Sequence, residues 1–232
     1  AVLAKVASPL ESGLKLLYVT PELLAKSKTA TSKLQSAYNK KALILIVIDE
    51  CHCCSAWGHE FRPDYLKLSV LKVNFPGTPV LALTATATDK VTQEVEDTLG
   101  ISGCMRFRGQ YNRPNLRYSV LSKSSTFDNT VADVAQYILD VHHDACGIVY
   151  CFSRKDTEAV AAGLQGHGIP AASYHAQLPM SERVQVHEQW SAGLVQVIVA
   201  TIAFGMGIDK HNVRFVIHHT MSKSLENYYQ ES

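Results

Sequence analysis

The sequence predicts an α/β fold with two parallel-sheet lobes. Short apolar runs, typical of buried strands, alternate with segments of helical periodicity along almost the whole chain of 232 residues. Most of these runs end in polar residues, which is where open α/β sheets bind their ligands. The alternation stops at residues 103–114, which are polar and rich in arginine and glycine, and then restarts. We therefore expect one lobe over residues 1–111 and a second over residues 112–232.

In the first lobe, apolar runs predict three strands, at residues 16–19, 43–48 and 80–83. The second run contains no polar residue, as in a strand that is buried on both faces. A polar helix is expected at residues 23–39. A further helix carries apolar residues at spacing four, at Val91, Val95 and Leu99. We expect Thr88 to cap the start of that helix, and Gly100 stands where helix-terminating glycines occur.

The second lobe repeats the same alternation. Four apolar runs predict strands at residues 147–152, 172–175, 195–200 and 215–219. Ser153 and Asp156 form a variant capping box for a helix that continues to Leu164. Another helix is expected at residues 179–190. Two lobes of this kind form a cleft between their strand ends, which is the default ligand site.

The composition excludes some classes of protein. Apolar residues make up 47% of the chain, which is ample for a packed core, and no segment approaches the roughly 20 apolar residues of a membrane span. With 22 basic and 21 acidic residues the net charge is +1, so any basic track for nucleic acid must be local. Six cysteines do not make a disulfide scaffold. Cys51, Cys53 and Cys54 with His52 suggest zinc, but no second ligand pair has zinc-finger spacing, so reduced thiols are the favoured interpretation.

The run Asp49-Glu50-Cys51-His52 directly follows the second predicted strand. If the ligand is a nucleoside triphosphate, Asp49 is suited to holding the Mg²⁺ that bridges its phosphates. Glu50 is then suited to orienting the attacking water as a general base. His52 is placed to sense the γ-phosphate and to pass that state to the other lobe.

Residues 57–65 hold three aromatic residues, one histidine and one arginine, without helical or strand periodicity. An ordinary core-filling loop explains this composition about as well as function does, because Trp57 and Phe61 have the i,i+4 spacing of a packed pair. The functional alternative is a loop that stacks on bases and contacts phosphate through Arg62.

Together these motifs resemble those of RecQ-family DNA helicases, in order and along nearly the whole chain. The matching segments are residues 18–22, 49–52, 55–65, 83–88, 112–116, 147–154, 174–176, 199–210 and 228–232, and residues 218–224 are similar to the shorter eukaryotic members. The resemblance implies two RecA-like lobes of the P-loop NTPase fold, helicase superfamily 2 type, both incomplete. It also implies ATP-driven 3′-to-5′ translocation on single-stranded DNA and duplex unwinding, with ATP and Mg²⁺ as cofactors and DNA as the partner.

The resemblance also assigns roles to residues. Asp49, Glu50 and His52 take the catalytic roles described above, with Asp49 as the Mg²⁺ ligand. The DNA-binding and coupling residues are Trp57, His59, Phe61, Arg62, Thr84, Thr86, Ser153, Arg154, His175, Thr201, Phe204 and Gly205. The nucleotide-binding residues are Asp49, Glu50, Gly207, Asp209 and Gln230. Structural alternatives are helix capping near Thr84 and Thr86, a structural histidine at His175, and a turn at Gly205 and Gly207, where glycine lets backbone approach a phosphate.

The sequence departs from the family pattern in several places. Cys51 stands where many members have alanine, and Ala56 stands where glutamine is usual, which puts one polar contact of the aromatic loop in doubt. The phosphate-binding pattern G-x-x-x-x-G-K-[ST] is absent from the sequence. In the family it lies upstream of the matched region, and the arginine finger lies downstream of Ser232. We therefore expect an internal fragment of a helicase core that hydrolyses ATP negligibly by itself.

Two other interpretations remain open. A non-catalytic DNA-binding or interaction protein derived from a helicase is the better one if the natural chain has these ends. An RNA helicase of a related box family is the lesser alternative, since the aromatic loop and Thr84-Ala85-Thr86 favour DNA. A nuclear location is expected from the eukaryotic resemblance, and no basic targeting run is visible.

Overall fold

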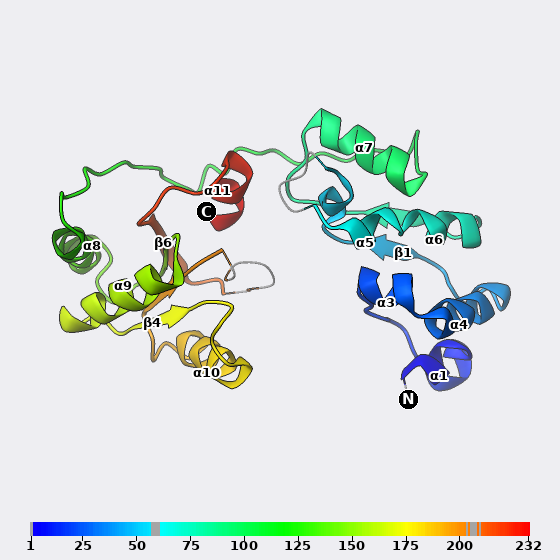
Figure 1. The fold of residues 1–232 in the computed structure, drawn as a ribbon, viewed down its shortest axis with the longest axis horizontal. Coiled ribbons are helices and arrows are strands. Elements are labelled where there is room, and N and C mark those ends of the chain that lie inside the picture. The colour runs from blue at the N-terminus through cyan, green and yellow to red at the C-terminus, as the bar shows by residue number, and fades with distance from the viewer. Residues whose placement is uncertain (1, 57–60, 203, 205–207, 209) are drawn as a thin grey trace. The chain divides into compact units, whose positions relative to one another are not determined.

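The computed structural model describes residues 2–56, 61–202, 204, 208 and 210–232. The chain divides into two compact units, residues 1–111 and 112–232 (Figure 1). Each unit contains a parallel sheet and helices, so both have the α/β architecture that the alternating pattern predicts. Among the described residues, no helix is both long and apolar enough to cross a membrane.

The first unit is built around a two-stranded parallel sheet, in which Val47 lies opposite Leu81. Its elements are α1 (Val2–Val6), α2 (Pro9–Ser12), α3 (Pro21–Lys26), α4 (Lys28–Asn39), β1 (Ile46–Ile48), the 3₁₀ turn η1 (Cys51–Cys54), α5 (Pro63–Leu66), α6 (Ser69–Asn74), β2 (Val80–Ala82) and α7 (Asp89–Leu99). Residues from β1, η1, α5, α6 and α7 form one hydrophobic core, with Phe75 fully buried.

Three predictions for the first unit are wrong. Residues 16–19 are not a strand, because none of the described residues pairs with them, and Tyr18 is 91% exposed. The strand at residues 43–48 is shorter than expected and is not buried on both faces, since Val47 is 52% exposed and its partner Leu81 is 42% exposed. In the described part of the chain, the core of this unit packs against only the opposite face of the sheet.

Local capping sets the helix boundaries of the first unit. The predicted helix at residues 23–39 divides at Ser27, whose N–H donates to Leu23 and whose hydroxyl accepts from Ala30 N at 3.2 Å. The predicted boundaries of α7 are confirmed. Thr88 Oγ1 accepts from Val91 N at 3.3 Å, and Gly100 adopts a left-handed conformation with φ of +66°.

The second unit holds a four-stranded parallel sheet in the order β4-β5-β3-β6. Its elements are α8 (Phe127–Val141), β3 (Cys146–Tyr150), α9 (Arg154–Gly166), β4 (Ala171–Tyr174), α10 (Met180–Ser191), β5 (Val197–Ala200), β6 (Val213–His218) and α11 (Leu225–Glu231). All four predicted strands are confirmed, with ends shifted by one or two residues. α8 was not predicted, although Val131, Ala135 and Ile138 give it a helical apolar stripe.

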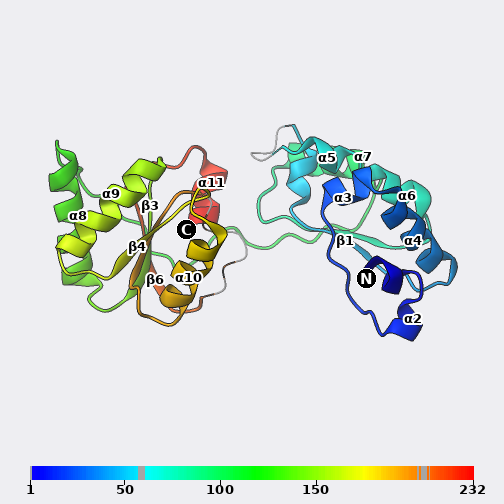
Figure 2. The same ribbon diagram turned by 60° about the horizontal axis from the view of Figure 1, so that its bottom comes forward.

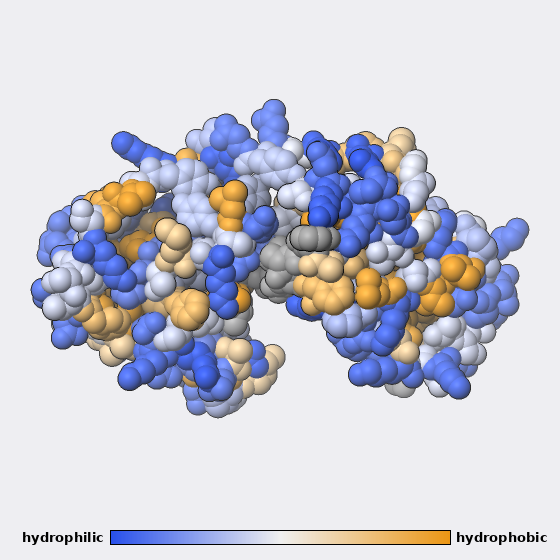
Figure 3. All heavy atoms as spheres, turned by 45° about the horizontal axis from the view of Figure 1, so that its top comes forward, coloured by the Kyte–Doolittle hydropathy of each residue, from blue (hydrophilic) through white to orange (hydrophobic). Residues whose placement is uncertain are grey.

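Helices cover both faces of this second sheet (Figure 2). α8 and α9 pack on one face through Val131, Ile138 and Leu164, whereas Trp190 of α10 packs on the other. Residues of β5 therefore alternate between two cores and all four are buried. On the face shown in Figure 3, apolar side chains lie among hydrophilic ones on both units.

Candidate functional site

The acidic motif forms a tight turn at the carboxyl end of β1. Glu50 has a φ of +50°, a left-handed conformation that is uncommon outside glycine, and its N–H donates to Asp49 Oδ1 at 2.9 Å. Cys51 N–H donates to Leu83 O at 2.9 Å, and Tyr65 Oη donates to Asp49 O at 3.3 Å. These bonds fix the backbone of the turn, while the Asp49 side chain remains exposed to solvent.

His52 connects this turn to the segment that follows β2. Its side chain is 1% exposed, and its Nδ1 lies 2.8 Å from Thr84 Oγ1 and 3.3 Å from Glu50 Oε2. Thr84 Oγ1 donates its one proton to Thr86 O at 3.0 Å. A Thr84 hydroxyl that donates to Thr86 O accepts from His52, which favours the Nδ1–H tautomer. The buried His52 ring thus lies between the glutamate of the acidic motif and Thr84.

The cysteines of η1 are buried beneath this turn. Cys51, Cys53 and Cys54 are at most 3% exposed, and burial raises the pKa of both Cys51 and Cys54 to about 12. These two thiols therefore keep their protons at neutral pH, whereas zinc is bound by thiolates. Within the described ranges, no group of three or more His, Cys, Asp or Glu side chains is placed to hold a metal ion.

The aromatic segment is only partly described. Trp57 and His59 lie outside the described residues. Phe61 is 41% exposed and Arg62 is exposed, and the Arg62 N–H donates to Cys53 O at 3.1 Å. The backbone at Arg62 is therefore bonded to η1, while the side chains of Phe61 and Arg62 are exposed. An exposed aromatic side chain beside an exposed basic one is suited to binding single-stranded nucleic acid.

In the second unit, candidate residues lie where the strands end. Ser153 caps α9 by accepting from Asp156 N at 3.1 Å, as the variant capping box predicts, and Arg154 is exposed. Thr201, after β5, is half-buried and its N–H donates to Tyr174 O at 3.3 Å. His175, after β4, is buried, with Nε2 3.1 Å from Glu158 Oε1.

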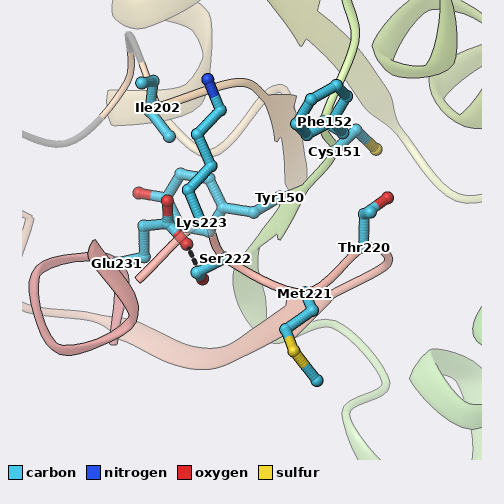
Figure 4. Close-up of a pocket in the computed structure, with 9 residues that line it drawn as sticks. All are labelled: Tyr150, Cys151, Phe152, Ile202, Thr220, Met221, Ser222, Lys223 and Glu231. Carbon is cyan, nitrogen blue, oxygen red and sulfur yellow. Dashed lines mark hydrogen bonds between the residues drawn. The ribbon is translucent and has the colours of Figure 1, made fainter. Parts of the chain in front are cut away.

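A pocket opens at the same edge, between the segments after β3, β5 and β6 (Figure 4). Phe152, Ile202, Thr220 and Lys223 line it, and the Lys223 ammonium lies 5.3 Å from the centre of the Phe152 ring. Sequence reasoning pointed to Ser153 and Arg154 but missed Phe152 and Lys223. The signal for Phe152 was a large aromatic residue directly after a strand.

Comparison with known proteins identifies this architecture. Residues 3–95 match the DEAD/DEAH box helicase family, and residues 129–232 match the helicase conserved C-terminal domain. The chain is 51% identical to ATP-dependent DNA helicase Q1 of Rattus norvegicus over 95% of its length, and 53% identical to ATP-dependent DNA helicase Q-like 2 of Arabidopsis thaliana over 96%. The chain belongs to the RecQ family. It spans 36% and 32% of the lengths of these two relatives.

A third relative agrees with the RecQ assignment, and a solved structure agrees with the fold alone. ATP-dependent DNA helicase hus2/rqh1 of Schizosaccharomyces pombe is 47% identical over 94% of the chain, which spans 16% of that protein. A solved structure of S. cerevisiae Dbp5, bound to RNA and ADP BeF3, superposes with a TM-score of 0.63. It covers 86% of this chain and 53% of the Dbp5 chain at 16% identity, so it shows the fold of the RecA-like lobes alone.

Several residues that the RecQ resemblance assigns to DNA are not accessible. Phe204 is 1% exposed and packs on Tyr174 and Trp190, with ring centres 4.7 and 5.3 Å away, so its side chain belongs to the core and does not reach a nucleic acid. Thr86 and His175 are also buried. Gly205, Gly207 and Asp209 lie outside the described residues. Sequence reasoning missed this because burial in a loop depends on neighbouring helices.

The RecQ motif at the end of the chain contains a second cluster that sequence reasoning missed. Gln230, on α11, is half-buried. The next residue, Glu231, is 9% exposed, accepts a hydrogen bond from Ser222 Oγ, and has Oε2 3.0 Å from His218 Nε2. A buried carboxylate that contacts a histidine and a serine is held by specific partners, as burial of a charge requires.

Proposed function

We propose that this chain is part of an ATP-dependent 3′-to-5′ DNA helicase. In this proposal ATP hydrolysis is coupled to translocation on single-stranded DNA and to duplex unwinding during repair, recombination or replication in the nucleus. The observation that carries it is the His52–Thr84 contact at 2.8 Å, beside Asp49 and Glu50 at the carboxyl end of β1. This contact joins the acidic turn, whose residues are suited to hydrolysis, to the segment that follows β2.

The residues of the turn fit a magnesium nucleotide. Asp49 is exposed and uses Oδ1 to accept the Glu50 N–H, so its second carboxylate oxygen faces solvent, which suits a hard cation. Mg²⁺, when bound with ATP, neutralises charge on the β- and γ-phosphates. Glu50 is proposed to accept the proton of the attacking water. Gln230, and Gly207 and Asp209 outside the described residues, are proposed as further nucleotide contacts.

His52 is proposed to link hydrolysis to movement. Its Nδ1 lies 2.8 Å from Thr84 Oγ1 and 3.3 Å from Glu50 Oε2, so a shift of the Glu50 carboxylate is proposed to change the contacts of this ring nitrogen. Thr84 is bonded in turn to both the N–H and the carbonyl of Thr86. Displacement at Glu50 is thereby passed into the backbone after β2.

DNA contacts are proposed for the exposed side chains of Phe61 and Arg62 in the first unit and of Arg154 in the second. Ser153 and Thr201 of the second unit are proposed as further DNA contacts. Trp57, His59 and Gly205 are proposed for the same role on the RecQ resemblance. Thr86, His175 and Phe204 are proposed to support these segments from within, since all three are buried.

Substitution of Glu50 tests the catalytic part of this proposal. In the full-length protein that contains this segment, Glu50→Gln is expected to lower DNA-stimulated ATP turnover about 10²–10⁴-fold, because a general base contributes that much. Glu182→Gln, an exposed carboxylate on α10, is the matched control and should retain turnover. Equal stimulation by poly(dT) and poly(U) would argue for the RNA alternative, and no turnover in the wild type would argue for a non-catalytic protein.

The 232-residue chain alone is expected to hydrolyse ATP negligibly, because its sequence has no G-x-x-x-x-G-K-[ST] pattern to hold the phosphates. Glu50-dependent ATP hydrolysis by the purified chain, stimulated by single-stranded DNA, would contradict this part of the proposal.

A further inference from the structure

Tyr150, the last residue of β3, contacts the segment after β5 and the last residue of β6. Its hydroxyl donates to the carbonyl of Phe204, after β5, at 2.7 Å. Its ring stacks on the His218 ring at the end of β6, with centres 5.6 Å apart and planes inclined by 22°. Tyr150 is 4% exposed, so both contacts are made inside the unit.

The His218 side of this contact leads to α11. His218 Nε2 lies 3.0 Å from Glu231 Oε2, and the same oxygen accepts a hydrogen bond from Ser222 Oγ (Figure 4). The His218 ring also lies 4.8 Å from the ring of Tyr228. These contacts attach the helix that carries Gln230 to the last strand of the sheet.

The Phe204 side is held equally firmly. The Phe204 N–H donates to Thr201 O at 3.0 Å, and its ring is enclosed by Tyr174 and Trp190. Its carbonyl is therefore fixed in position and receives the Tyr150 proton in a buried environment. Burial and the Glu231 carboxylate raise the pKa of Tyr150 far above its ordinary value, so the hydroxyl keeps its proton and acts as a donor.

We propose that Tyr150 is a positioning residue that holds the segment after β5 and α11 in one fixed relation. This inference rests on the proposed function, in which Thr201 contacts DNA and Gln230 contacts the nucleotide. One side chain then sets the position of a DNA-binding segment and a nucleotide-binding helix in the same unit. Coupling through contiguous packed and hydrogen-bonded groups is the usual physical form of such a link.

The Tyr150 hydroxyl makes the hydrogen bond to Phe204, and it can be removed without changing the packing of the ring on His218. Tyr150→Phe keeps the ring on His218 but leaves the buried Phe204 carbonyl without this donor. Glu231→Gln removes the negative charge next to His218 on the α11 side, and glutamine has nearly the same shape as glutamate. Tyr150→Phe acts on the Phe204 side of Tyr150, and Glu231→Gln acts on the His218 side. The double variant therefore measures how strongly the two sides interact.

The test uses amide chemical shifts of the ¹⁵N-labelled 232-residue chain. Glu231→Gln is expected to shift the Phe204 amide, and this shift is expected to fall at least about threefold when Tyr150→Phe is also present. The matched controls are Asp133→Asn, which alters another carboxylate bonded to a serine hydroxyl, and Tyr137→Phe, which removes the hydroxyl of a half-buried tyrosine on α8. Neither control should move the Phe204 amide.

Each outcome decides the question. A Phe204 shift from Glu231→Gln no larger than that from Asp133→Asn would overturn the inference. So would a shift that persists unchanged in the Tyr150→Phe background, because the effect would then bypass the hydroxyl. If Tyr150→Phe fails to fold, Ser222→Ala is used instead, because it removes the hydrogen bond from Ser222 to Glu231. The Phe204 amide chemical shift must then change in Ser222→Ala.

A binding measurement separates this inference from the proposed function. Tyr150→Phe is expected to weaken binding of a fluorescent oligo(dT) to the chain about three- to tenfold, as expected for one lost hydrogen bond. If the unsubstituted chain does not bind oligo(dT), the proposed function fails in this segment while the chemical-shift result still stands. If oligo(dT) binds and Tyr150→Phe has no effect in either measurement, the positioning role is wrong.

Discussion

The Nδ1 atom of His52 lies 2.8 Å from the hydroxyl of Thr84, 32 residues further along the chain. Both residues follow strands, β1 and β2, that pair in parallel, and the pairing brings their polar ends together. The Thr84 hydroxyl donates a hydrogen bond to Thr86 O, which favours His52 as the donor in its contact with Thr84. A buried histidine therefore connects the ends of neighbouring strands.

Removal of the Thr84 hydroxyl tests this connection. Thr84→Val preserves shape but removes the hydroxyl that lies 2.8 Å from the buried His52 Nδ1, so the free energy of unfolding of the first unit should fall by about 1–3 kcal/mol. Urea-dependent hydrogen exchange of peptides from residues 1–111 measures this change. Thr84→Ser retains the hydroxyl and is expected to lose less than half as much. Equal losses in both variants would contradict a role for the hydrogen bond.

The packing of α8 on α9 depends on Gly163. A Cβ atom at this position would lie 2.5 Å from Val131 Cγ1, so Gly163→Ala should lower the free energy of unfolding of the second unit by about 1–3 kcal/mol. Gly166→Ala is the control on the same helix, because its Cβ would meet no atom within 4 Å. That variant should be neutral or more stable by up to about 1 kcal/mol. Thermal unfolding of both variants provides the comparison.

The cysteines should differ sharply in reactivity. Cys51, Cys54 and Cys151 are buried and each has its pKa raised to about 12. Cys104 is exposed, although desolvation and the Glu96 carboxylate also raise its pKa. A maleimide at pH 7.5 should therefore modify Cys104 within minutes and the three buried thiols only after denaturation. Peptide mass spectrometry locates the label, and Cys104→Ser should abolish the rapid phase. Rapid labelling of Cys51 in the native chain would show that η1 is not packed as described.

Acid should destabilise the second unit through His219. Burial, and to a lesser extent Lys123, lower the pKa of this histidine, so near pH 6 the unfolded chain binds a proton that the folded chain does not. Stability contributed by neutral His219 is present above the ordinary histidine pKa of about 6.5 and is lost as the pH falls below it, by at most about 1.4 kcal/mol per pH unit. His142, whose pKa is lowered by burial, acts in the same direction.

Urea unfolding at pH 7 and pH 5 measures this dependence. His219→Phe preserves the aromatic contact with Phe127, at 5.6 Å, and should lose less stability between the two pH values than the wild type. His143→Phe replaces an exposed histidine and should not change the difference. An unchanged pH dependence in His219→Phe would show that other groups cause the acid sensitivity.

The chain's local structure follows largely from its sequence. The boundaries of α7 and α9 were predictable because Thr88, Gly100 and Ser153 cap them through neighbours three or four residues away. Strands β3 and β5 of the second unit were predictable because each is an apolar run that is buried between two layers of helices. The helical spacing of Val131, Ala135 and Ile138 would have located α8 in the same way.

Other features were decided only by the tertiary structure. Val47 looked as buried as any strand residue, yet its face of the sheet is open, because exposure depends on what packs against a strand rather than on its own apolarity. Phe204 matched a DNA-binding motif but is enclosed by Tyr174 and Trp190. By itself the sequence determined the alternating elements, their caps and the family motifs, since these are set by near neighbours. The contacts of His52 with Thr84 and of Tyr150 with Phe204 join residues 32 and 54 positions apart, and only the pairing order of the strands brings them together.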